Sequence, residues 1–197
     1  LVAGDAGVVH DHVHAAVTPI SALTAWQGLF EHARIDAGQH ILIHGAAGGV
    51  GSFAVQFAHW RGARVTATVS AANIDFVGDL GADEVIDYKQ MPILKGLAAA
   101  APDGIDVYFD NVGGDHLDAA LALARNNAHF AICGMIEGYN TGQPTSLRFA
   151  MRIISARIAI KGFIVFDYFP RMAEFYADMA PWMANGSPVA STALSSM

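Results

Sequence analysis

A glycine-rich run, Gly45–Gly51 (GAAGGVG), holds the residues of this chain that are best suited to chemistry. It directly follows a short apolar stretch, Ile41–Ile43, and directly precedes a helical pattern, Val50–Trp60. A strand, a glycine loop and a helix in this order form a cradle for phosphate groups, because the helix start offers N–H groups and a positive dipole end. The alternative interpretation is a turn that only packs the helix against the strand, and the context favours the cradle.

The pattern G-x-G-x-x-G gives each position of such a loop a separate task. The first position makes a tight turn, the second lets a pyrophosphate approach the backbone, and the third lets the helix pack close to the strand. In this chain the three positions are Ala46, Gly48 and Gly51. We expect Gly49 and Val50, which lie between the last two, to bind the same phosphates.

The second strand of the predicted fold favours NADP over NAD. A dinucleotide site that selects NAD places Asp or Glu about 20 residues beyond the glycine loop. Here the corresponding segment, Thr68–Asn73 (TVSAAN), contains no acid, and a carboxylate there would repel a 2′-phosphate. Ser70 can donate a hydrogen bond to that phosphate, although it can also be read as an ordinary helix cap.

The composition indicates one α/β domain with an apolar sequence. The chain has 197 residues, of which 53% are hydrophobic and 15% are charged. This length suffices to bury a sizeable core. Buried parallel strands account for part of the apolar excess, and a surface that meets another domain or subunit would account for the rest.

Several classes of partner and location are disfavoured. The net charge of −7 argues against nucleic acid. No stretch reaches the ~18 uninterrupted apolar residues of a membrane span, and the first residues lack the basic region of a signal peptide. The single cysteine, Cys133, excludes an internal disulfide and fits the cytoplasm. We expect it to be a small buried residue.

Apolar stretches alternate with helical patterns along the chain, which predicts a doubly wound sheet of six parallel strands. The predicted strands are His40–His44, Arg64–Val69, Glu84–Asp87, Ile105–Phe109, Phe130–Cys133 and Arg157–Phe163. The predicted helices are one that follows Pro19, then Val50–Arg61, Asn73–Leu80, Met91–Ala101, His116–Leu123, Ser146–Ser155 and Arg171–Ala184.

Six segments between Pro19 and Gly186 resemble one known family. They are Leu23–Trp26, His44–Gly51, Leu80–Tyr88, Phe109–Gly114, Cys133–Asn140 and Gly162–Val165. Their order and spacing resemble the cofactor domain of medium-chain dehydrogenase/reductases, in the zinc-independent quinone-oxidoreductase and enone-reductase branches. The front half is more similar to quinone oxidoreductases and the back half to enone reductases.

The resemblance implies a Rossmann fold from which the family's GroES-like catalytic domain is missing. It divides the chain into an N-terminal remnant or linker (1–17), an NADP-binding domain (18–186) and a tail (187–197). It also implies that Tyr88 reaches the 2′-phosphate, with a packed tyrosine as the alternative. Asn73 stands where the family often has a phosphate-binding Lys. Thr24 belongs to a segment that implies a further cofactor contact.

Towards the nicotinamide, the resemblance implies a second group of contacts. Asn111 and the segment Cys133-Gly134-Met135-Ile136 are expected near the nicotinamide ribose. The segment Phe163-Ile164-Val165 is expected to line the nicotinamide and to hold its carboxamide through backbone contacts.

Tyr139 is the candidate for proton chemistry. The resemblance implies that it supports protonation of the enolate that forms after hydride transfer, because a phenol can stabilise or protonate the oxygen that becomes negative. The alternative is a loop tyrosine that covers the cofactor. Alternating His10, His12 and His14 could bind a metal on one strand face, but their place near the start of the chain favours a frayed terminal segment, and we predict no metal site.

Together these residues predict an NADP(H)-binding domain of a zinc-independent reductase that acts on an enone, an enal or a quinone. The alternative is a non-catalytic module that binds or senses NADPH. An NAD-linked zinc alcohol dehydrogenase is disfavoured by the second strand and the missing ligands. The last predicted strand, Arg157–Phe163, is expected to pair with a second copy of the chain, because the family closes that sheet edge as a homodimer.

Overall fold

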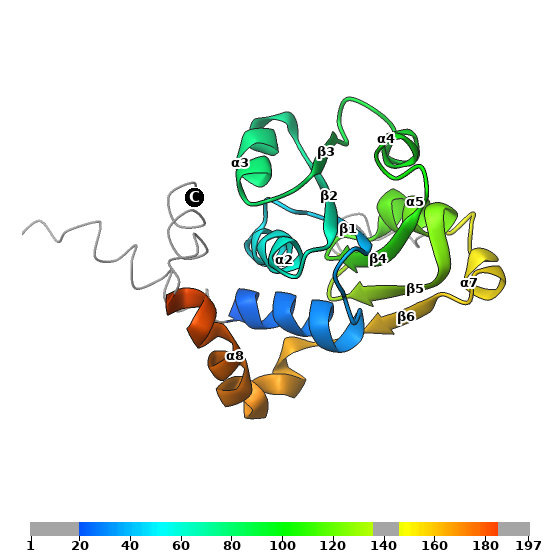
Figure 1. Ribbon diagram of the computed structural model, residues 1–197. Helices are drawn as coiled ribbons and strands as arrows, with labels where there is room; N and C mark the ends of the chain where they lie inside the picture. The colour runs from blue at the N-terminus through cyan, green and yellow to red at the C-terminus, as the bar shows by residue number, and fades with distance from the viewer. Residues whose placement is uncertain (1–19, 136–145, 185–197) are drawn as a thin grey trace, which may run out of the picture.

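The computed structural model describes residues 20–135 and 146–184, which form one open sheet covered by helices on both faces (Figure 1). The strand order is β3-β2-β1-β4-β5-β6, and every neighbouring pair is parallel. The strands are β1 (His40–His44), β2 (Arg64–Val69), β3 (Glu84–Asp87), β4 (Ile105–Asp110), β5 (Ala124–Ile132) and β6 (Ala159–Gly162). The prediction of a doubly wound sheet of six parallel strands is confirmed.

The first described helix covers residues 20–26 and continues into η1 (Gln27–His32). The longer helices that follow are α2 (Gly49–Trp60), α4 (Ile93–Ala100), α5 (Gly114–Leu123) and α8 (Met172–Ala184). The shorter ones are η2 (Ala71–Asn73), α3 (Ile74–Asp79), α7 (Arg152–Ser155) and η3 (Val165–Arg171).

Strand order reverses between β1 and β4, which are neighbours in the centre of the sheet. The first strand, β1, lies in the centre of the sheet, and β2 and β3 follow on one side of it. The chain then returns to the centre and adds β4, β5 and β6 on the other side of β1. The loops that follow β1 and β4 therefore leave in opposite directions at the carboxyl edge. In open α/β sheets this reversal is where ligands bind.

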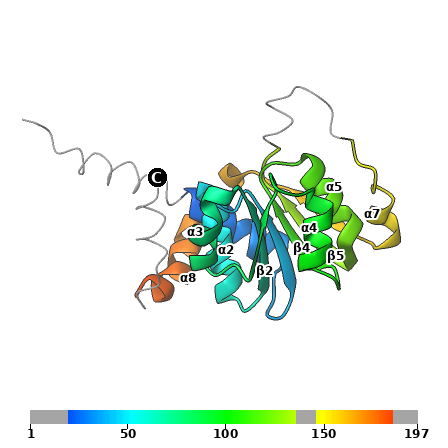
Figure 2. The same ribbon diagram turned by 90° about the horizontal axis from the view of Figure 1, so that it is seen from above.

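Figure 2 shows the sheet between two layers of helices, with α2, α3 and α8 on one face and α4, α5 and α7 on the other. Each face has its own apolar core. Phe57 of α2 and Phe175 of α8 belong to one, and Leu97 of α4 and Leu121 of α5 belong to the other. Strand β1 is buried along its whole length, as a parallel strand covered on both faces must be.

Several predicted boundaries were wrong for local reasons. Strand β5 begins at Ala124 and not at Phe130, because its first half contains polar residues and a left-handed residue, Asn127 (φ 63°), that an apolar pattern does not reveal. Helix α4 begins at Ile93, because a proline such as Pro92 disfavours helical geometry in the residue before it. Only Arg152–Ser155 of the predicted helix Ser146–Ser155 is helical.

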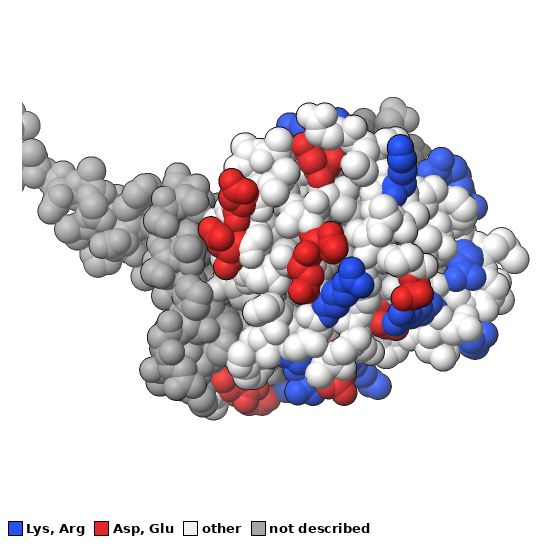
Figure 3. All heavy atoms as spheres, turned by 45° about the horizontal axis from the view of Figure 1, so that its top comes forward, with Lys and Arg blue, Asp and Glu red and all other residues white. Residues whose placement is uncertain are grey.

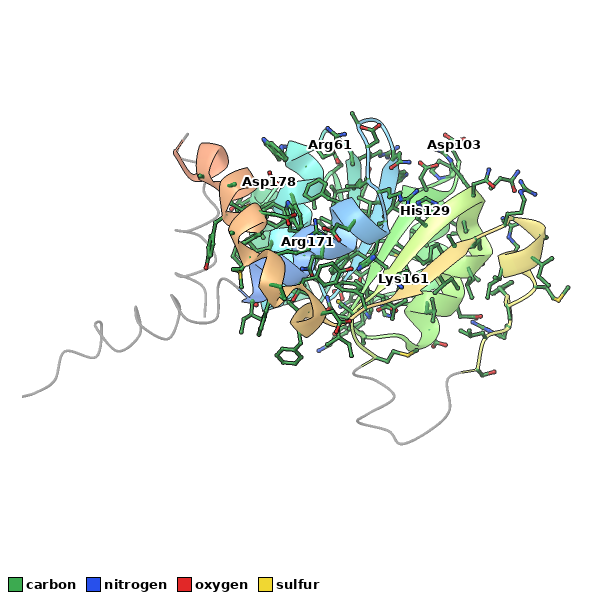
Figure 4. All side chains as sticks on the ribbon, turned by 90° about the horizontal axis from the view of Figure 1, so that it is seen from below. Arg61, Asp103, His129, Lys161, Arg171 and Asp178 are labelled. Carbon is green, nitrogen blue, oxygen red and sulfur yellow. The ribbon has the colours of Figure 1, made fainter. Side chains whose placement is uncertain are left out.

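A polar cluster fastens the C-terminal elements to η1. Arg171 forms an ion pair with Glu31 of η1 at 2.5 Å and with Glu174 of α8 at 2.7 Å. The Tyr168 hydroxyl lies 2.7 Å from His32 Nε2. Figure 4 shows Arg171 beside the helix of η1, between that helix and α8. The cluster connects segments that are more than a hundred residues apart in the sequence.

On the face seen in Figure 3, acidic and basic side chains are scattered, with wide uncharged surface between them. Trp60, at the end of α2, is among the exposed aromatic residues. None of the helices in the described ranges is long and apolar enough to cross a membrane.

Candidate functional site

The glycine loop after β1 packs against the start of α2 at backbone contact distance. Gly45 has a φ of +70°, a conformation that favours glycine, and turns the chain out of the strand. A Cβ added at Gly51 would lie 2.1 Å from the carbonyl oxygen of Gly45. A Cβ at Gly48 would meet only that same oxygen, at 3.3 Å. The close packing of helix against loop therefore depends on Gly51, whereas a Cβ at Gly48 would make one tight contact that a small shift could relieve.

The start of α2 is suited to an anion. Gly48 is the N-cap residue, so no side chain caps the helix, and the first turn contains no acid. The first N–H groups of a helix lack partners within the helix, and its N-terminus carries a partial positive charge. A pyrophosphate can bind here without displacing a side chain.

A cavity of about 480 Å³ opens at the carboxyl ends of β1 and β2, beside the glycine loop. Its volume is in the range of small-molecule sites. The residues that line it are His44, Gly45, Ala47, Gly48, Thr68, Val69, Ser70, Asn73, Tyr88, Pro92, Ile93, Val112, Asp115 and His116. The structure thus brings together four predicted site residues, Gly48, Ser70, Asn73 and Tyr88. The Asn73 amide donates to Ser70 Oγ at 3.4 Å.

Two histidines stack face to face in the wall of this cavity. The ring centroids of His44 and His116 are 3.4 Å apart and the rings are nearly parallel, at 12°. His44 Nδ1 lies 2.6 Å from Thr68 Oγ1. Burial, with a contribution from His116, lowers the pKa of His44 to about 2, and burial lowers the pKa of His116 to about 4. Both rings are therefore uncharged at neutral pH.

A second group of predicted residues meets where the loops after β4 and β5 run side by side. The Cys133 thiol donates to Asn111 Oδ1 at 2.6 Å, and the Cys133 amide donates to the Asp110 carbonyl at 2.9 Å. A Cβ at Gly134 would lie 2.9 Å from the Asn111 carbonyl oxygen, so the loops touch there. Cys133 is partly exposed, not fully buried as expected. Burial and the nearby Asp110 raise the pKa of its thiol to about 12.

A buried carboxylate shapes the loop between the two groups. Asp110 ends β4 and accepts hydrogen bonds from the amides of Val112 and Gly113, at 2.8 and 2.9 Å. This turns the chain so that Val112 approaches the glycine loop, where its Cγ2 would lie 3.5 Å from a Cβ at Gly45. The cavity and the Asn111–Cys133 contact therefore lie on adjacent loops of one edge.

The structure places other predicted residues differently. Ala46 is fully buried, and Thr24 is buried in its helix, where its hydroxyl donates to the Ile20 carbonyl at 2.7 Å. Phe163 is buried, with its ring centroid 4.7 Å from that of His32, while Ile164 is exposed. Met135 and Val165 are partly buried. Ile136 and Tyr139 lie outside the described residues, as do His10, His12 and His14.

A larger cavity, of about 750 Å³, lies elsewhere, between η1, α2 and α8. Ile35 and Asp36, which precede β1, line it, so it belongs to the amino-end side of the sheet. Arg61 and Asp178 in its rim are labelled in Figure 4. None of the predicted site residues lines this cavity, and ligands of open α/β sheets bind at the opposite edge.

The zinc-binding dehydrogenase family matches residues 49–185 of the chain. The chain belongs to this family. The NADP(+)-dependent 2-alkenal reductase of Nicotiana tabacum is 32% identical over 179 residues, which cover 89% of this chain and 52% of that protein. The NADPH-dependent curcumin reductase of Escherichia coli (strain K12) is 31% identical over 175 residues, covering 85% and 51%.

Among solved structures, the crystal structure of CurA from Vibrio vulnificus in complex with NADPH is similar to this chain. It has a TM-score of 0.77 and 35% identity, over 84% of this chain and 51% of the other. The chain thus spans about half the length of the relatives it matches. The expected branch, the zinc-independent enone and quinone reductases within the medium-chain dehydrogenase/reductases, is confirmed.

The sequence patterns did not predict every residue of this candidate site. The sequence patterns assigned no role at this site to five residues that line the cavity, His44, Thr68, Pro92, Ile93 and His116. One contact could have been predicted from the sequence. His44 and Thr68 lie at the carboxyl ends of neighbouring parallel strands, where they are paired in register. Within the described ranges, no group of three or more His, Cys, Asp or Glu side chains is placed to hold a metal ion.

Proposed function

We propose that this chain is the NADP(H)-binding domain of a zinc-independent oxidoreductase that transfers hydride to an activated C=C bond or a quinone. The observation that carries the proposal is the cavity beside the glycine loop, which gathers Gly48, Ser70, Asn73 and Tyr88 at the strand-order reversal. The named activities of the alkenal and curcumin reductases support it.

The residues of the cavity fit an adenine dinucleotide that carries a 2′-phosphate. The amides of Gly49, Val50 and Gly51 at the start of α2 would hold the pyrophosphate. Ser70 and Asn73 would donate to the 2′-phosphate, together with the hydroxyl of Tyr88. The end of β2 offers no carboxylate to repel that dianion.

The loops after β4 and β5 would hold the nicotinamide half. Asn111, Cys133, Gly134 and Met135 lie at this edge, and Phe163–Val165 directly follows β6. When bound, the cofactor supplies the hydride. The protein's part is to fix the ring, and the proposed role of Tyr139 is to hold or deliver the proton that the reduced product takes up.

Gly48→Val tests whether the cradle has been placed correctly. The backbone at Gly48 is extended (φ −76°, ψ 168°), and an added Cβ would make one tight contact, 3.3 Å from the Gly45 carbonyl oxygen, so the fold should survive with modest strain. A branched side chain would occupy the space that the pyrophosphate needs, and NADPH affinity should fall at least tenfold. A variant that keeps its circular dichroism spectrum and its NADPH affinity would contradict the proposed cradle.

The alternative, a module that binds NADPH without turning it over, makes a different prediction for the isolated chain. Oxidation of NADPH, followed at 340 nm with an enone and with a quinone, separates the two. Steady turnover supports the reductase, and tight binding without turnover supports the module. The relatives favour a reductase when the rest of the protein is present.

We also propose that the chain forms a homodimer through β6, in the cytoplasm. Strand β6 is an outer strand of the sheet and all four of its residues are exposed. Of the large apolar residues in the predicted strand Arg157–Phe163, Ile160 is exposed, whereas Ile158 and Phe163 are buried and cannot contribute to an interface. Ile154 of α7 precedes the strand in the sequence and Ile164 follows it, and both are also exposed.

A further inference from the structure

The stacked histidines present an unusual wall to the cofactor cavity. His44 is 4% exposed and His116 is 9% exposed, yet the Nε2 atom of neither ring has a hydrogen-bond partner among the described residues. Two polar rings are thus buried in contact with each other, from β1 and α5, which are distant in the sequence. A hydrophobic pair would fill the space without leaving polar atoms unsatisfied.

Tyr88 rests with its ring against both histidines. Its ring centroid is 5.5 Å from that of His116, at 77°, and 6.3 Å from that of His44, at 89°. Both are edge-to-face arrangements, which aromatic rings favour. Tyr88 is 40% exposed and follows β3, with its amide donating to the Val69 carbonyl at 3.3 Å. The histidine stack is therefore the support against which this side chain is oriented.

The surroundings hold the stack in one orientation. Thr68 of β2 fixes the His44 ring through Nδ1, at 2.6 Å. The titratable groups that face the pair are Tyr88, from the loop after β3, and Asp115 of α5, which opposes the lowering of the His116 pKa. The effect of burial on the pKa of His116 is larger than that of Asp115, and both rings stay uncharged above about pH 5. The support is thus unchanged across the physiological pH range.

We propose that His44 and His116 are positioning residues for Tyr88, and that through Tyr88 they determine how strongly the site prefers a dinucleotide with a 2′-phosphate. This inference rests on the proposed function, because Tyr88 must contact that phosphate. The pair itself need not touch the ligand. Its effect should therefore be confined to ligands that carry the 2′-phosphate and should disappear when Tyr88 is removed.

A double-mutant cycle measures this dependence. We would determine the Kd of NADP⁺ and of NAD⁺ at pH 7.5 by calorimetry for the unaltered chain, His116→Ala, Tyr88→Ala and the double variant. Each single variant should weaken NADP⁺ binding about tenfold, and the double variant should be within about twofold of Tyr88→Ala. NAD⁺ affinity should change less than about twofold throughout. His116→Phe, which restores a ring, should recover most of the NADP⁺ affinity, and exposed His59→Ala serves as the control.

Different failures have different meanings. If the unaltered chain binds no NADP⁺, the proposed function is wrong and this inference falls with it. If NADP⁺ binds but the two single effects multiply to about a hundredfold, or His116→Ala weakens NAD⁺ and NADP⁺ equally, only the inference is overturned. If His116→Ala does not fold, His116→Asn takes its place in the same cycle, with the same two outcomes.

Discussion

A methyl group at Gly51 would lie 2.1 Å from the Gly45 carbonyl oxygen and 2.8 Å from Ala46 Cα. Both are backbone atoms, so the loop and α2 would have to separate to admit it. We expect Gly51→Ala to lower the free energy of unfolding by about 1–3 kcal/mol. Urea denaturation measures this loss, and calorimetry should show weaker NADPH binding, because the phosphate cradle widens.

Gly78→Ala is the matched control for Gly51→Ala. Gly78 also lies in a helix, α3, but no atom is within 4 Å of an added methyl group. Alanine is the better helix former, so this change should raise the free energy of unfolding by about 0.5–1 kcal/mol. If both substitutions had the same effect, close packing at Gly51 would not explain its identity.

The histidine stack predicts that stability falls in weak acid. The pKa of His116 is lowered to about 4 and that of His44 to about 2, from 6.5 in the unfolded chain. Between pH 6.5 and the lowered pKa values, each histidine is protonated in the unfolded chain but not in the folded chain. The free energy of unfolding therefore decreases as the pH falls below 6.5. At pH 5 each histidine should contribute a loss of about 2 kcal/mol. His116→Phe should therefore lose about 2 kcal/mol less than the unaltered chain between pH 7.5 and 5, and identical losses would contradict this account.

Cys133 should react slowly with alkylating agents despite its partial exposure. Its thiol pKa is raised to about 12, and the thiolate is the reactive form. At pH 8 we expect alkylation by iodoacetamide to be roughly a thousandfold slower than in the urea-unfolded chain, because the thiolate fraction falls by about that factor. Mass spectrometry of timed samples gives both rates, and equal rates would show that burial and Asp110 do not keep the thiol protonated.

At the scale of elements, the two edges of the sheet differ in how they resist association. Strand β3 carries Glu84 and Asp87, whereas Lys161 is the one charged residue in β6, labelled in Figure 4. Charged side chains protect edge strands from pairing with another chain. Ile160→Asp should therefore convert the dimer to a monomer, or precipitate the chain, while the unaltered chain stays dimeric at micromolar concentration.

Multi-angle light scattering reads the outcome of that substitution directly. Ile74→Asp, on α3, is a suitable control, because Ile74 is 37% exposed and Ile160 is 41% exposed. The control should leave the dimer intact. A monodisperse monomer for the unaltered chain would contradict the proposed dimer through β6.

The elements that sequence patterns predicted well are those that burial governs. Strands β1 and β2 were predicted at their observed boundaries, because strands covered on both faces read as short apolar runs. The predicted start of strand β5 was six residues too late, because the first half of the strand is polar and includes the left-handed Asn127. Exposed polar strands depend on pairing with neighbours, which a local pattern does not contain.

At the scale of the whole molecule, the candidate site is a consequence of strand order. Gly48, Ser70 and Tyr88 follow β1, β2 and β3, and their meeting at one edge could be predicted because parallel strands end together. The stack of His44 on His116 could not, because it depends on how α5 lies against β1. Contacts between a helix and a strand that is distant in sequence have no signature in either segment alone.

The preference of the chain for NADPH over NADH tests the central claim most directly. Calorimetric titration of the unaltered chain with both cofactors should give a Kd for NADPH at least about tenfold lower, because Ser70, Asn73 and Tyr88 offer donors and no carboxylate lies in the way. Ser70→Asp should reverse the order, since its carboxylate would repel the 2′-phosphate and accept from the ribose hydroxyls of NADH. Equal affinities, or tighter binding of NADH by the unaltered chain, would contradict the assignment of this cavity to NADP(H).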